Sequence, residues 1–200
     1  MKKTLPVTII IPTKNEEQNL PRLLKSINKQ SVAPIEVIVA DANSVDKTLD
    51  IAKEFEAKII KGGSPSVGRN RGAEIAKGEI LFFMDADTYF LGNEDFLGIY
   101  KKFLEQNYDI SSCYFKADTQ SKTIQGLLNF LKWFGTRKYN KILKWDFGAF
   151  LIIKKDAFER VNGFDENISV MEDVSIIHKL NRFGYSHGMI NKRIGITLTL

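Results

Sequence analysis

The run Ile80-Leu81-Phe82-Phe83-Met84, followed at once by Asp85-Ala86-Asp87, constrains the fold of this chain more than any other segment. An unbroken apolar run that ends in polar residues is typical of a strand buried on both faces, as in a parallel sheet covered by helices. Open α/β sheets bind their ligands beyond the carboxyl ends of the strands. The two aspartates are therefore expected at a ligand-binding edge.

The rest of the first half alternates between strand and helix patterns. Strands are predicted at residues 7–11, 35–40 and 58–60, before the strand at 80–84. Between them, apolar residues recur at helical spacing, with Asn15 and Asp46 expected to cap the first two helices and Glu16 and Glu17 in the first turn of the first. Short strand–helix repeats of this kind favour a mainly parallel sheet with right-handed crossovers.

The second half is less regular. It predicts a helix over 96–104, strands at 110–115 and 147–153, helices at 156–161 and 172–182, and a final strand at 193–200. An apolar and aromatic segment lies at 124–134. With no repeat, linker or low-complexity segment, the 200 residues are expected to form one α/β domain with a mixed, mainly parallel sheet, in two halves of about 1–90 and 91–200.

Composition narrows the class of protein only modestly. The net charge of +5 suits an anionic ligand or membrane surface. The single cysteine, Cys113, excludes an internal disulfide and is interpreted as a small buried apolar residue. No apolar run is long enough to cross a bilayer, and the first residues lead into a strand rather than a signal peptide. These features predict a cytoplasmic location.

Two carboxylates one residue apart suit a hard divalent cation that also binds a diphosphate. No Cys/His cluster accompanies Asp85 and Asp87, so Mg²⁺ or Mn²⁺ is favoured over zinc. Alone, the pattern is equally typical of two solvated turn residues.

Three further polar segments follow strands at the same predicted edge. They are Pro12-Thr13-Lys14-Asn15-Glu16, Asp41-Ala42-Asn43-Ser44-Val45-Asp46 and Gly68-Arg69-Asn70-Arg71-Gly72. Asp41 could accept hydrogen bonds from a base or ribose, and arginines at a helix start suit a diphosphate. Ordinary strand-to-helix loops and solvated arginines explain each segment separately, so the argument rests on their common edge.

Taken together, these motifs resemble a family 2 glycosyltransferase of GT-A fold. The resemblance runs from about Val7 to Tyr185 through I-I-P-T-K-N-E-E, V-I-V-A-D-A-N-S-V-D-K-T, G-R-N-R-G, F-F-M-D-A-D, G-A-F-L-I-I, G-F-D-E and M-E-D. It implies transfer of a sugar from a nucleoside diphosphate donor to an acceptor hydroxyl, with inversion at the anomeric carbon. Residues 1–90 would then be the donor half and 91–200 the acceptor half.

The resemblance also implies site residues. A nucleotide-sugar pocket would contain Pro12, Thr13, Glu16, Asp41, Arg69, Asp85 and Ala86, with Asp41 on the base, most often uracil, and Arg69 on the nucleotide or diphosphate. Asp87 would bind the metal directly, and Asp85 would lie near the ribose or sugar. Lys14 replaces an aromatic residue common in the family, and residues 43–46 depart from its usual Gly-Ser-Ser-Asp-Asp.

Met171-Glu172-Asp173 resembles the part of the family that carries the general base. Asp173 would take the acceptor proton, with Glu172 beside it. Two acidic residues at a helix start are also favoured by the helix dipole alone.

Residues 116–145 combine basic and aromatic side chains. Seven Lys or Arg stand there against one acid, Asp118, in a segment that also contains Trp133 and Trp145. One interpretation is a peripheral contact with an anionic cytoplasmic membrane face, near a lipid-linked acceptor. The other is that the aromatic residues form core and the lysines are solvated. No nucleic-acid-binding motif accompanies the segment.

Other functions remain to be weighed. A sugar nucleotidyltransferase shares the layout but usually carries a Gly-rich basic loop after its first strand, which Pro12-Thr13-Lys14-Asn15 is not. No G-x-G-x-x-G follows a strand, which disfavours a dinucleotide oxidoreductase. A non-catalytic nucleotide-sugar-binding or scaffold protein is the third alternative. The donor sugar, the acceptor, the oligomeric state and whether the chain is shortened are left open.

Overall fold

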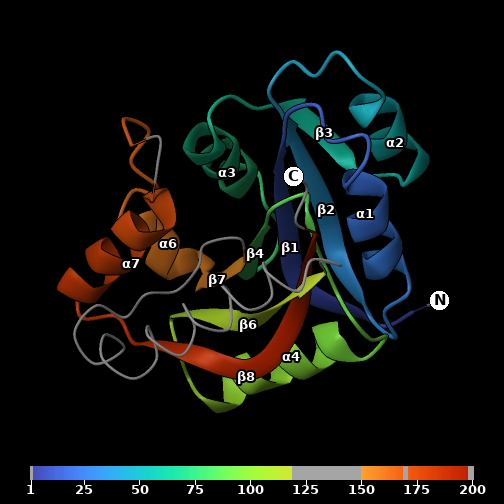
Figure 1. The fold of residues 1–200 in the computed structure, drawn as a ribbon. Helices are drawn as coiled ribbons and strands as arrows, with labels where there is room; N and C mark the ends of the chain where they lie inside the picture. The colour runs from blue at the N-terminus through green and yellow to red at the C-terminus, as the bar shows by residue number, and fades with distance from the viewer. Residues whose placement is uncertain (1, 119–149, 169–170, 198–200) are drawn as a thin grey trace.

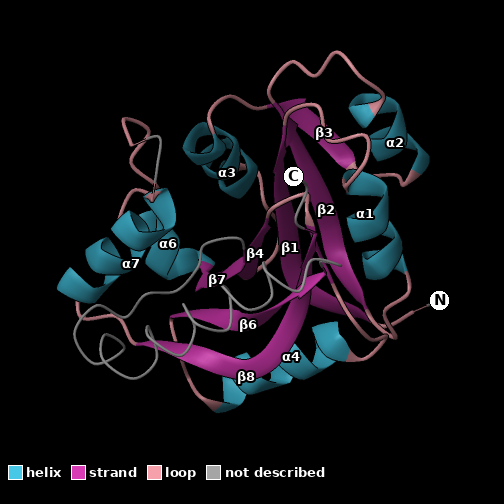
Figure 2. Cartoon of the chain, in the orientation of Figure 1, coloured by secondary structure: helices cyan, strands magenta, loops and turns pink. Residues whose placement is uncertain are grey.

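The computed structural model describes residues 2–118, 150–168 and 171–197 of the chain. These residues form one eight-stranded sheet in the order β3-β2-β1-β4-β7-β6-β8-β5. Helices lie against both faces of the sheet (Figures 1 and 2). The predicted fold class, an α/β domain with a mixed, mainly parallel sheet, is confirmed.

The first half supplies the parallel part of the sheet. Its strands are β1 (Thr4–Thr13), β2 (Ala33–Asp41), β3 (Lys58–Lys61) and β4 (Ile80–Met84). β1 pairs with both β2 and β4, and β2 pairs with β3, all in parallel. The carboxyl ends of these strands therefore meet at one edge, as the alternating pattern predicted.

The helices of the first half are α1 (Leu20–Asn28), α2 (Thr48–Glu54) and α3 (Pro65–Glu74). The prediction that Asn15 caps α1 is wrong, since the helix begins at Leu20 and Asn15 adopts a left-handed φ of 56° in the preceding loop. Asp46 accepts a hydrogen bond from the backbone N–H of Thr48 at the start of α2, in keeping with its predicted capping role. Ser64 caps α3, with Pro65 in the first turn.

From Thr88 onward, the chain completes the sheet with four further strands and adds three described helices. The strands are β5 (Thr88–Tyr89), β6 (Ile110–Asp118), β7 (Phe150–Lys154) and β8 (His187–Thr197). The described helices are α4 (Asp95–Glu105), α6 (Lys155–Arg160) and α7 (Glu172–Arg182). β7 pairs antiparallel with β4 and β6, β5 pairs antiparallel with β8, and β6 pairs parallel with β8. β5 was not predicted, and the strand expected at 193–200 begins earlier, at His187. The segment 124–134 lies outside the described residues.

Strand β4 is the centre of the core, and all five of its side chains are buried. Ile80, Phe82 and Met84 pack into the cluster that includes residues of α1 and α4, whereas Leu81 and Phe83 pack into the cluster on the face of α3, α6 and α7. Phe82 makes edge-to-face contacts with Phe96 and Phe150, each at 5.4 Å between ring centroids. The prediction of a strand buried on both faces is confirmed, and Cys113 is also buried.

Candidate active site

The ends of β1 and β2 are joined by a hydrogen-bond network around Asp41. Oδ1 of Asp41 accepts from the hydroxyls of Thr13, at 3.2 Å, and Ser44, while Oδ2 accepts from the Ser44 backbone N–H at 2.9 Å. A carboxylate offers about four acceptor positions. Three are used, and the remaining one is on Oδ2. Asp41 is therefore held in place with capacity for one further donor, such as the N–H of a base.

The loop that follows β1 is fastened to the loop that follows β2. Oδ1 of Asn15 accepts from the Val45 N–H at 2.9 Å, and the Glu16 N–H donates to the Thr48 hydroxyl at 2.7 Å. One continuous wall is thus formed by two segments, the one with Pro12, Thr13 and Glu16 and the one with Asp41. Ser44 and Thr48 were missed as site residues, although a hydroxyl two or three residues after an aspartate, as Ser44 is after Asp41 and Thr48 after Asp46, is a recognisable turn and capping pattern.

Helix α3 packs very closely over the same strand ends. A Cβ on Gly72 would lie 2.5 Å from Cγ2 of Ile10, and one on Gly68 would lie 3.3 Å from Cβ of Ala40. Because α3 begins at Pro65, Arg69 lies in the helix interior, and the expectation that it stands at the helix start is wrong. Because Gly68 and Gly72 have no side chains, α3 can lie close to the sheet, and Arg69 is thereby placed at the edge of the sheet.

Arg69 is buried and holds two carboxylates. Its Nη2 donates to Oδ1 of Asp85 and its Nη1 to Oε1 of Glu172, both at 2.6 Å. The Arg69 side chain is 3% exposed, Glu172 14% and Asp85 37%, so solvent screens the Asp85 pair more than the Glu172 pair. Burial alone would lower the pKa of Arg69, but the charges of Asp85 and Glu172 raise it above its ordinary value.

The Asp85-Ala86-Asp87 segment forms a tight turn after β4. The carbonyl of Asp85 accepts from the N–H of Thr88 at 3.0 Å and from its hydroxyl at 2.7 Å, and Ala86 is buried. The carbonyl of Asp87 accepts from the N–H of Thr197 at 2.8 Å, next to the pairing of β5 with β8. The backbone thus fixes where the two carboxylates leave the turn.

Burial raises the pKa of both aspartates in the turn, and for Asp85 it outweighs the opposing charge of Arg69. Burial, with added repulsion from Asp85 and Glu16, raises the pKa of the Asp87 carboxyl to about 6. Its Oδ1 is buried and has no hydrogen-bond partner among the described residues. A buried carboxylate oxygen without a partner, beside two further acids, fits the surroundings of a hard cation.

Within the described ranges, no cluster of three or more His, Cys, Asp or Glu side chains is arranged to hold a metal unaided. This is compatible with Mg²⁺ or Mn²⁺, because Mg²⁺ usually binds through one or two carboxylates together with substrate phosphates and water. The residues present therefore fit a cation that arrives with a diphosphate.

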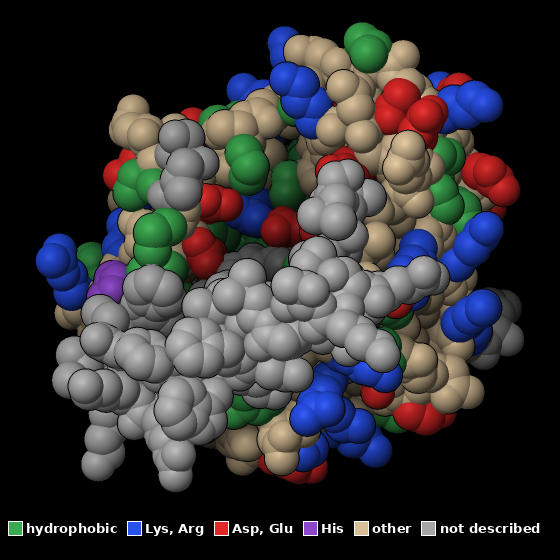
Figure 3. All heavy atoms as spheres, in the orientation of Figure 1, with side chains coloured by type: hydrophobic (Ala, Val, Ile, Leu, Met, Phe, Trp, Pro, Cys, Tyr) green, Lys and Arg blue, Asp and Glu red, His purple; other side chains and the backbone are tan. Residues whose placement is uncertain are grey.

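Asp173 lies at the start of α7, directly after Glu172. Burial raises the pKa of Asp173, as does the nearby charge of Glu172, whereas the Val174 N–H and Arg69 lower it. A carboxylate with a raised pKa is a better proton acceptor than an ordinary one. Figure 3 shows acidic side chains around a hollow between α3 and α7, with basic atoms deeper between them.

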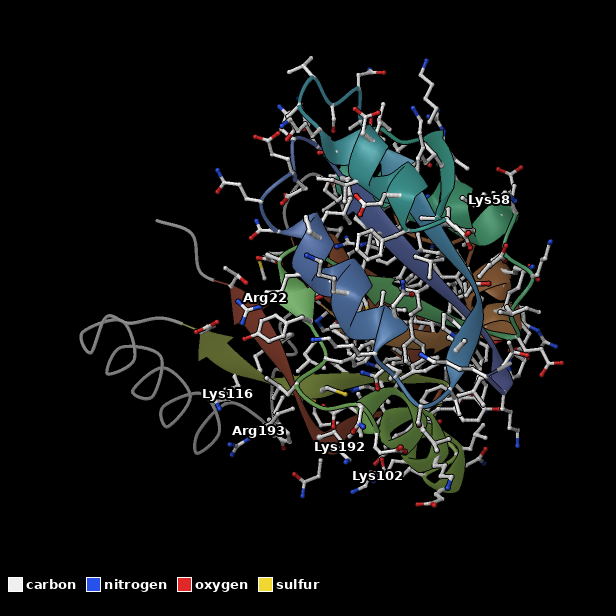
Figure 4. The ribbon with its side chains drawn as sticks, turned by 90° about the vertical axis from the view of Figure 1, so that its right-hand side faces the viewer. Arg22, Lys58, Lys102, Lys116, Lys192 and Arg193 are labelled. Carbon is white, nitrogen blue, oxygen red and sulfur yellow. The ribbon has the colours of Figure 1, made fainter. Side chains whose placement is uncertain are left out.

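The basic and aromatic segment 116–145 is mostly outside the described residues, and its membrane role stays a prediction. Lys116 and Arg193, from the paired strands β6 and β8, point outward in Figure 4, and Arg22 stacks over the Tyr89 ring at 3.6 Å. In the part of the chain that the structure describes, no helix has both the length and the apolar character to span a membrane.

Fold and site together define a class of protein, an α/β domain whose polar loops gather at the carboxyl ends of its parallel strands around an acidic centre. Residues 8–162 match the model of the family described as glycosyl transferase family 2. The chain therefore belongs to this family, and the resemblance inferred from its motifs is confirmed.

The chain is also similar to individual members with known names. It is 39% identical over 115 residues to a 4,4'-diaponeurosporenoate glycosyltransferase of Staphylococcus haemolyticus, covering 52% of the chain and 30% of the relative. It is 31% identical over 118 residues to a poly(ribitol-phosphate) beta-glucosyltransferase of Bacillus spizizenii, covering 54% of the chain and 18% of the relative. The matched region thus spans less than a third of either relative.

Solved structures confirm the GT-A fold. TarS residues 1–349 of Staphylococcus aureus, in complex with UDP-GlcNAc, superpose with a TM-score of 0.75 at 22% identity, covering 100% of this chain and 59% of that one. The mannosyltransferase PcManGT of Pyrobaculum calidifontis, in complex with GDP-Man and Mn²⁺, gives 0.74 at 20% identity, covering 95% and 56%. At these identities the likeness concerns the fold alone.

Proposed function

We propose that this chain transfers a sugar from a nucleoside diphosphate donor, UDP-linked in the first instance, to an acceptor hydroxyl, with inversion at the anomeric carbon. The observation that carries the proposal is the buried Oδ1 of Asp87, which has no partner among the described residues and belongs to a carboxyl with a pKa of about 6. An acid in such surroundings suits a bound cation and diphosphate better than a purely structural role.

The donor would lie along the wall formed by Pro12, Thr13, Glu16 and Asp41. The free acceptor position on Asp41 Oδ2 would take one N–H of the base. Asp87 would bind Mg²⁺ or Mn²⁺, which when present neutralises charge on the departing diphosphate. Asp85 and Ala86 would border the ribose or sugar at the turn.

Asp173 would act as the general base. It would remove the proton from the acceptor hydroxyl while the hydroxyl oxygen forms a bond to the anomeric carbon, on the side opposite the diphosphate. The bond between that carbon and the diphosphate oxygen would break, and its electron pair would leave with the diphosphate. Burial supports this role because it raises the proton affinity of Asp173.

The acceptor is proposed only as a class. The relatives are named for 4,4'-diaponeurosporenoate and for poly(ribitol-phosphate), which are different acceptors. The proposed acceptor is linked to lipid. The enzyme would reach it through peripheral contact of residues 116–145 with an anionic cytoplasmic membrane face. Sedimentation with anionic liposomes at low salt tests it, and absence of binding would contradict it.

Thermal-shift measurements with UDP-, GDP- and dTDP-sugars, each with and without Mn²⁺, test the donor proposal. Stabilisation that needs both nucleotide and Mn²⁺ is expected for one donor class. Donor binding without turnover, across a panel of acceptors and water, would favour a nucleotide-sugar-binding scaffold. No stabilisation by any donor would contradict the proposal.

A further inference from the structure

The buried Arg69 joins parts of the chain that are far apart in sequence. Its guanidinium reaches Asp85, 16 residues later, and Glu172, 103 residues later, at 2.6 Å in both cases. Asp85 belongs to the turn after β4, whereas Glu172 is the first residue of α7. One side chain therefore connects the proposed donor side of the site with the element that carries Asp173.

The burial of Arg69 makes these contacts obligatory. A guanidinium that is 3% exposed has lost most of its hydration, which is costly unless carboxylates replace the lost water. Both terminal nitrogens are used for this purpose, and little of the group is left accessible to a ligand. The geometry thus suits a side chain that holds other residues better than one that mainly grips a diphosphate.

Glu172 is similarly committed to Arg69. Its side chain is only 14% exposed, and its Oε1 faces the guanidinium. Its carboxylate is therefore engaged by Arg69 rather than turned toward an acceptor. Asp173, by contrast, has a raised pKa. The two neighbouring acids therefore have different surroundings and suit different roles.

The backbone at the start of α7 adds an independent observation. Met171 has a φ of 63° and a ψ of 30°, a left-handed conformation that costs energy for a residue with a side chain. Such a conformation persists where surrounding contacts impose it. The Arg69–Glu172 pair, one residue further on, is one such contact at the start of α7.

We propose that Arg69 and Glu172 are positioning residues that hold Asp173 in register with the Asp85 turn, and that Glu172 is not a second base. The proposal rests on the assignment of Asp173 as the base. It predicts that the rate of the chemical step, rather than donor affinity, depends on the Arg69–Glu172 pair. It also predicts that changing either Arg69 or Glu172 has about the same effect as changing both.

The test uses a double-mutant cycle of Arg69→Lys, Glu172→Gln and the double variant. Arg71→Lys is the matched control, since Arg71 is on the same helix and donates to the backbone carbonyls of Lys61 and Gly62. Two readouts are taken. They are hydrogen exchange of the peptide spanning the start of α7, with α4 as internal reference, and turnover of UDP-N-acetylglucosamine with Mn²⁺, with water as the acceptor.

Both single variants and the double variant are expected to lose protection from hydrogen exchange at the start of α7 but not in α4. The loss in the double variant should be smaller than the sum of the losses in the two single variants. kcat should fall by up to about 100-fold, as expected for a misplaced catalytic group, while the donor KM stays within about twofold of wild type. Arg71→Lys should change neither readout.

Unchanged exchange at α7 in Glu172→Gln would overturn the proposal, as would an Arg69→Lys variant whose defect is confined to donor KM. Additive effects would overturn the claim that the pair acts as a unit. If the wild-type protein does not turn over this donor, the proposed function fails for that donor, and the exchange measurement still decides the link between Arg69 and α7.

Discussion

Glu16, in the loop after β1, lies near enough to Asp87, in the turn after β4, for its negative charge to raise the pKa of Asp87. The two residues are brought together because β1 and β4 are parallel neighbours whose carboxyl ends coincide. Asp85 adds repulsion from the same turn. The edge thus concentrates negative charge where a cation and a diphosphate are proposed to bind.

Replacing Asp87 by Asn should abolish the dependence of nucleotide binding on Mn²⁺. The variant keeps the size of the side chain but loses the charge that attracts the cation. Calorimetric titration of UDP with and without Mn²⁺ measures the effect. Equal enhancement by Mn²⁺ in the variant and the wild type would contradict the assignment.

The stability of the cation-free protein should depend on pH through Asp87. Its pKa is raised from 3.8 to about 6 on folding, so the folded state binds more protons in this interval and stability falls as pH rises through it. Asp87→Asn should therefore raise Tm at pH 7.5, with a smaller gain below pH 4. Thermal melts in EDTA measure this difference, and a variant less stable than wild type at pH 7.5 would argue against a strained carboxylate.

Protons should also compete with the cation at this site. We expect Mn²⁺-dependent UDP binding to weaken as the pH falls below about 6, where Asp87 becomes protonated. Titrations at pH 5, 6 and 7.5 in one ionic strength test this. Affinity that is constant over the whole range would place the cation elsewhere.

Asp173→Asn should lower turnover by about 10²- to 10⁴-fold, because a positioned general base contributes that much. UDP affinity in the presence of Mn²⁺ should be preserved, since Asp173 is placed on the acceptor side. Single-turnover assays alongside UDP titrations separate the two effects. Wild-type rates in this variant would refute the base.

Asp41→Asn should weaken UDP binding without loss of the fold. The amide cannot accept at every position used by Thr13, Ser44 and a base N–H. Hydrogen bonds to a charged group contribute about 1.5–3 kcal/mol, so a loss of about tenfold or more is expected. Asp50→Asn on the exposed face of α2 is the control. The affinity of each variant for UDP is measured by titration. Equal affinities in the two variants would show that Asp41 does not bind the nucleotide.

The close packing of α3 on β1 should make Gly72 intolerant of a side chain. Gly72→Ala places Cβ 2.5 Å from Cγ2 of the buried Ile10, and overpacking of this kind costs about 1–3 kcal/mol. Gly98→Ala, in α4, is the matched control, because its nearest atom is Cε of the flexible Lys192 at 3.1 Å and helices favour Ala by about 0.5–1 kcal/mol. Urea denaturation should show Gly72→Ala as the less stable variant, and the reverse order would show that α3 can shift away from β1.

Much of the architecture follows from local patterns. The buried run of β4 and the strand end near Asp41 could be predicted, because periodicity and strand–helix alternation are properties of neighbouring residues. The first strand was predicted at 7–11, and β1 extends beyond this range at both ends, from Thr4 to Thr13. Helix α7 was predicted with the bounds that it has in the structure, Glu172–Arg182. The roles of Asp87, Asp173 and the remaining site residues, in contrast, stay predictions.

Contacts that depend on tertiary packing could not be predicted in the same way. The pairing of Arg69 with Glu172 joins residues 103 positions apart and requires the close approach of α3 that glycines permit. Asn15 was predicted to cap a helix because asparagine is a favoured capping residue. In the structure its side-chain oxygen instead accepts a hydrogen bond from the Val45 N–H of a neighbouring loop. The two-residue strand β5 exists only because β8 lies beside it.

The hydrogen bond from the Thr197 N–H to the Asp87 carbonyl ties the far end of β8 to the turn that presents the acidic pair. The first and second halves of the chain are therefore interdependent in construction, even though they follow one another in the sequence. A fragment cut near residue 90 would lack the strand that braces Asp87. Engineering of this domain, by splitting, permutation or exchange of its second half, has to keep β8 with the first half.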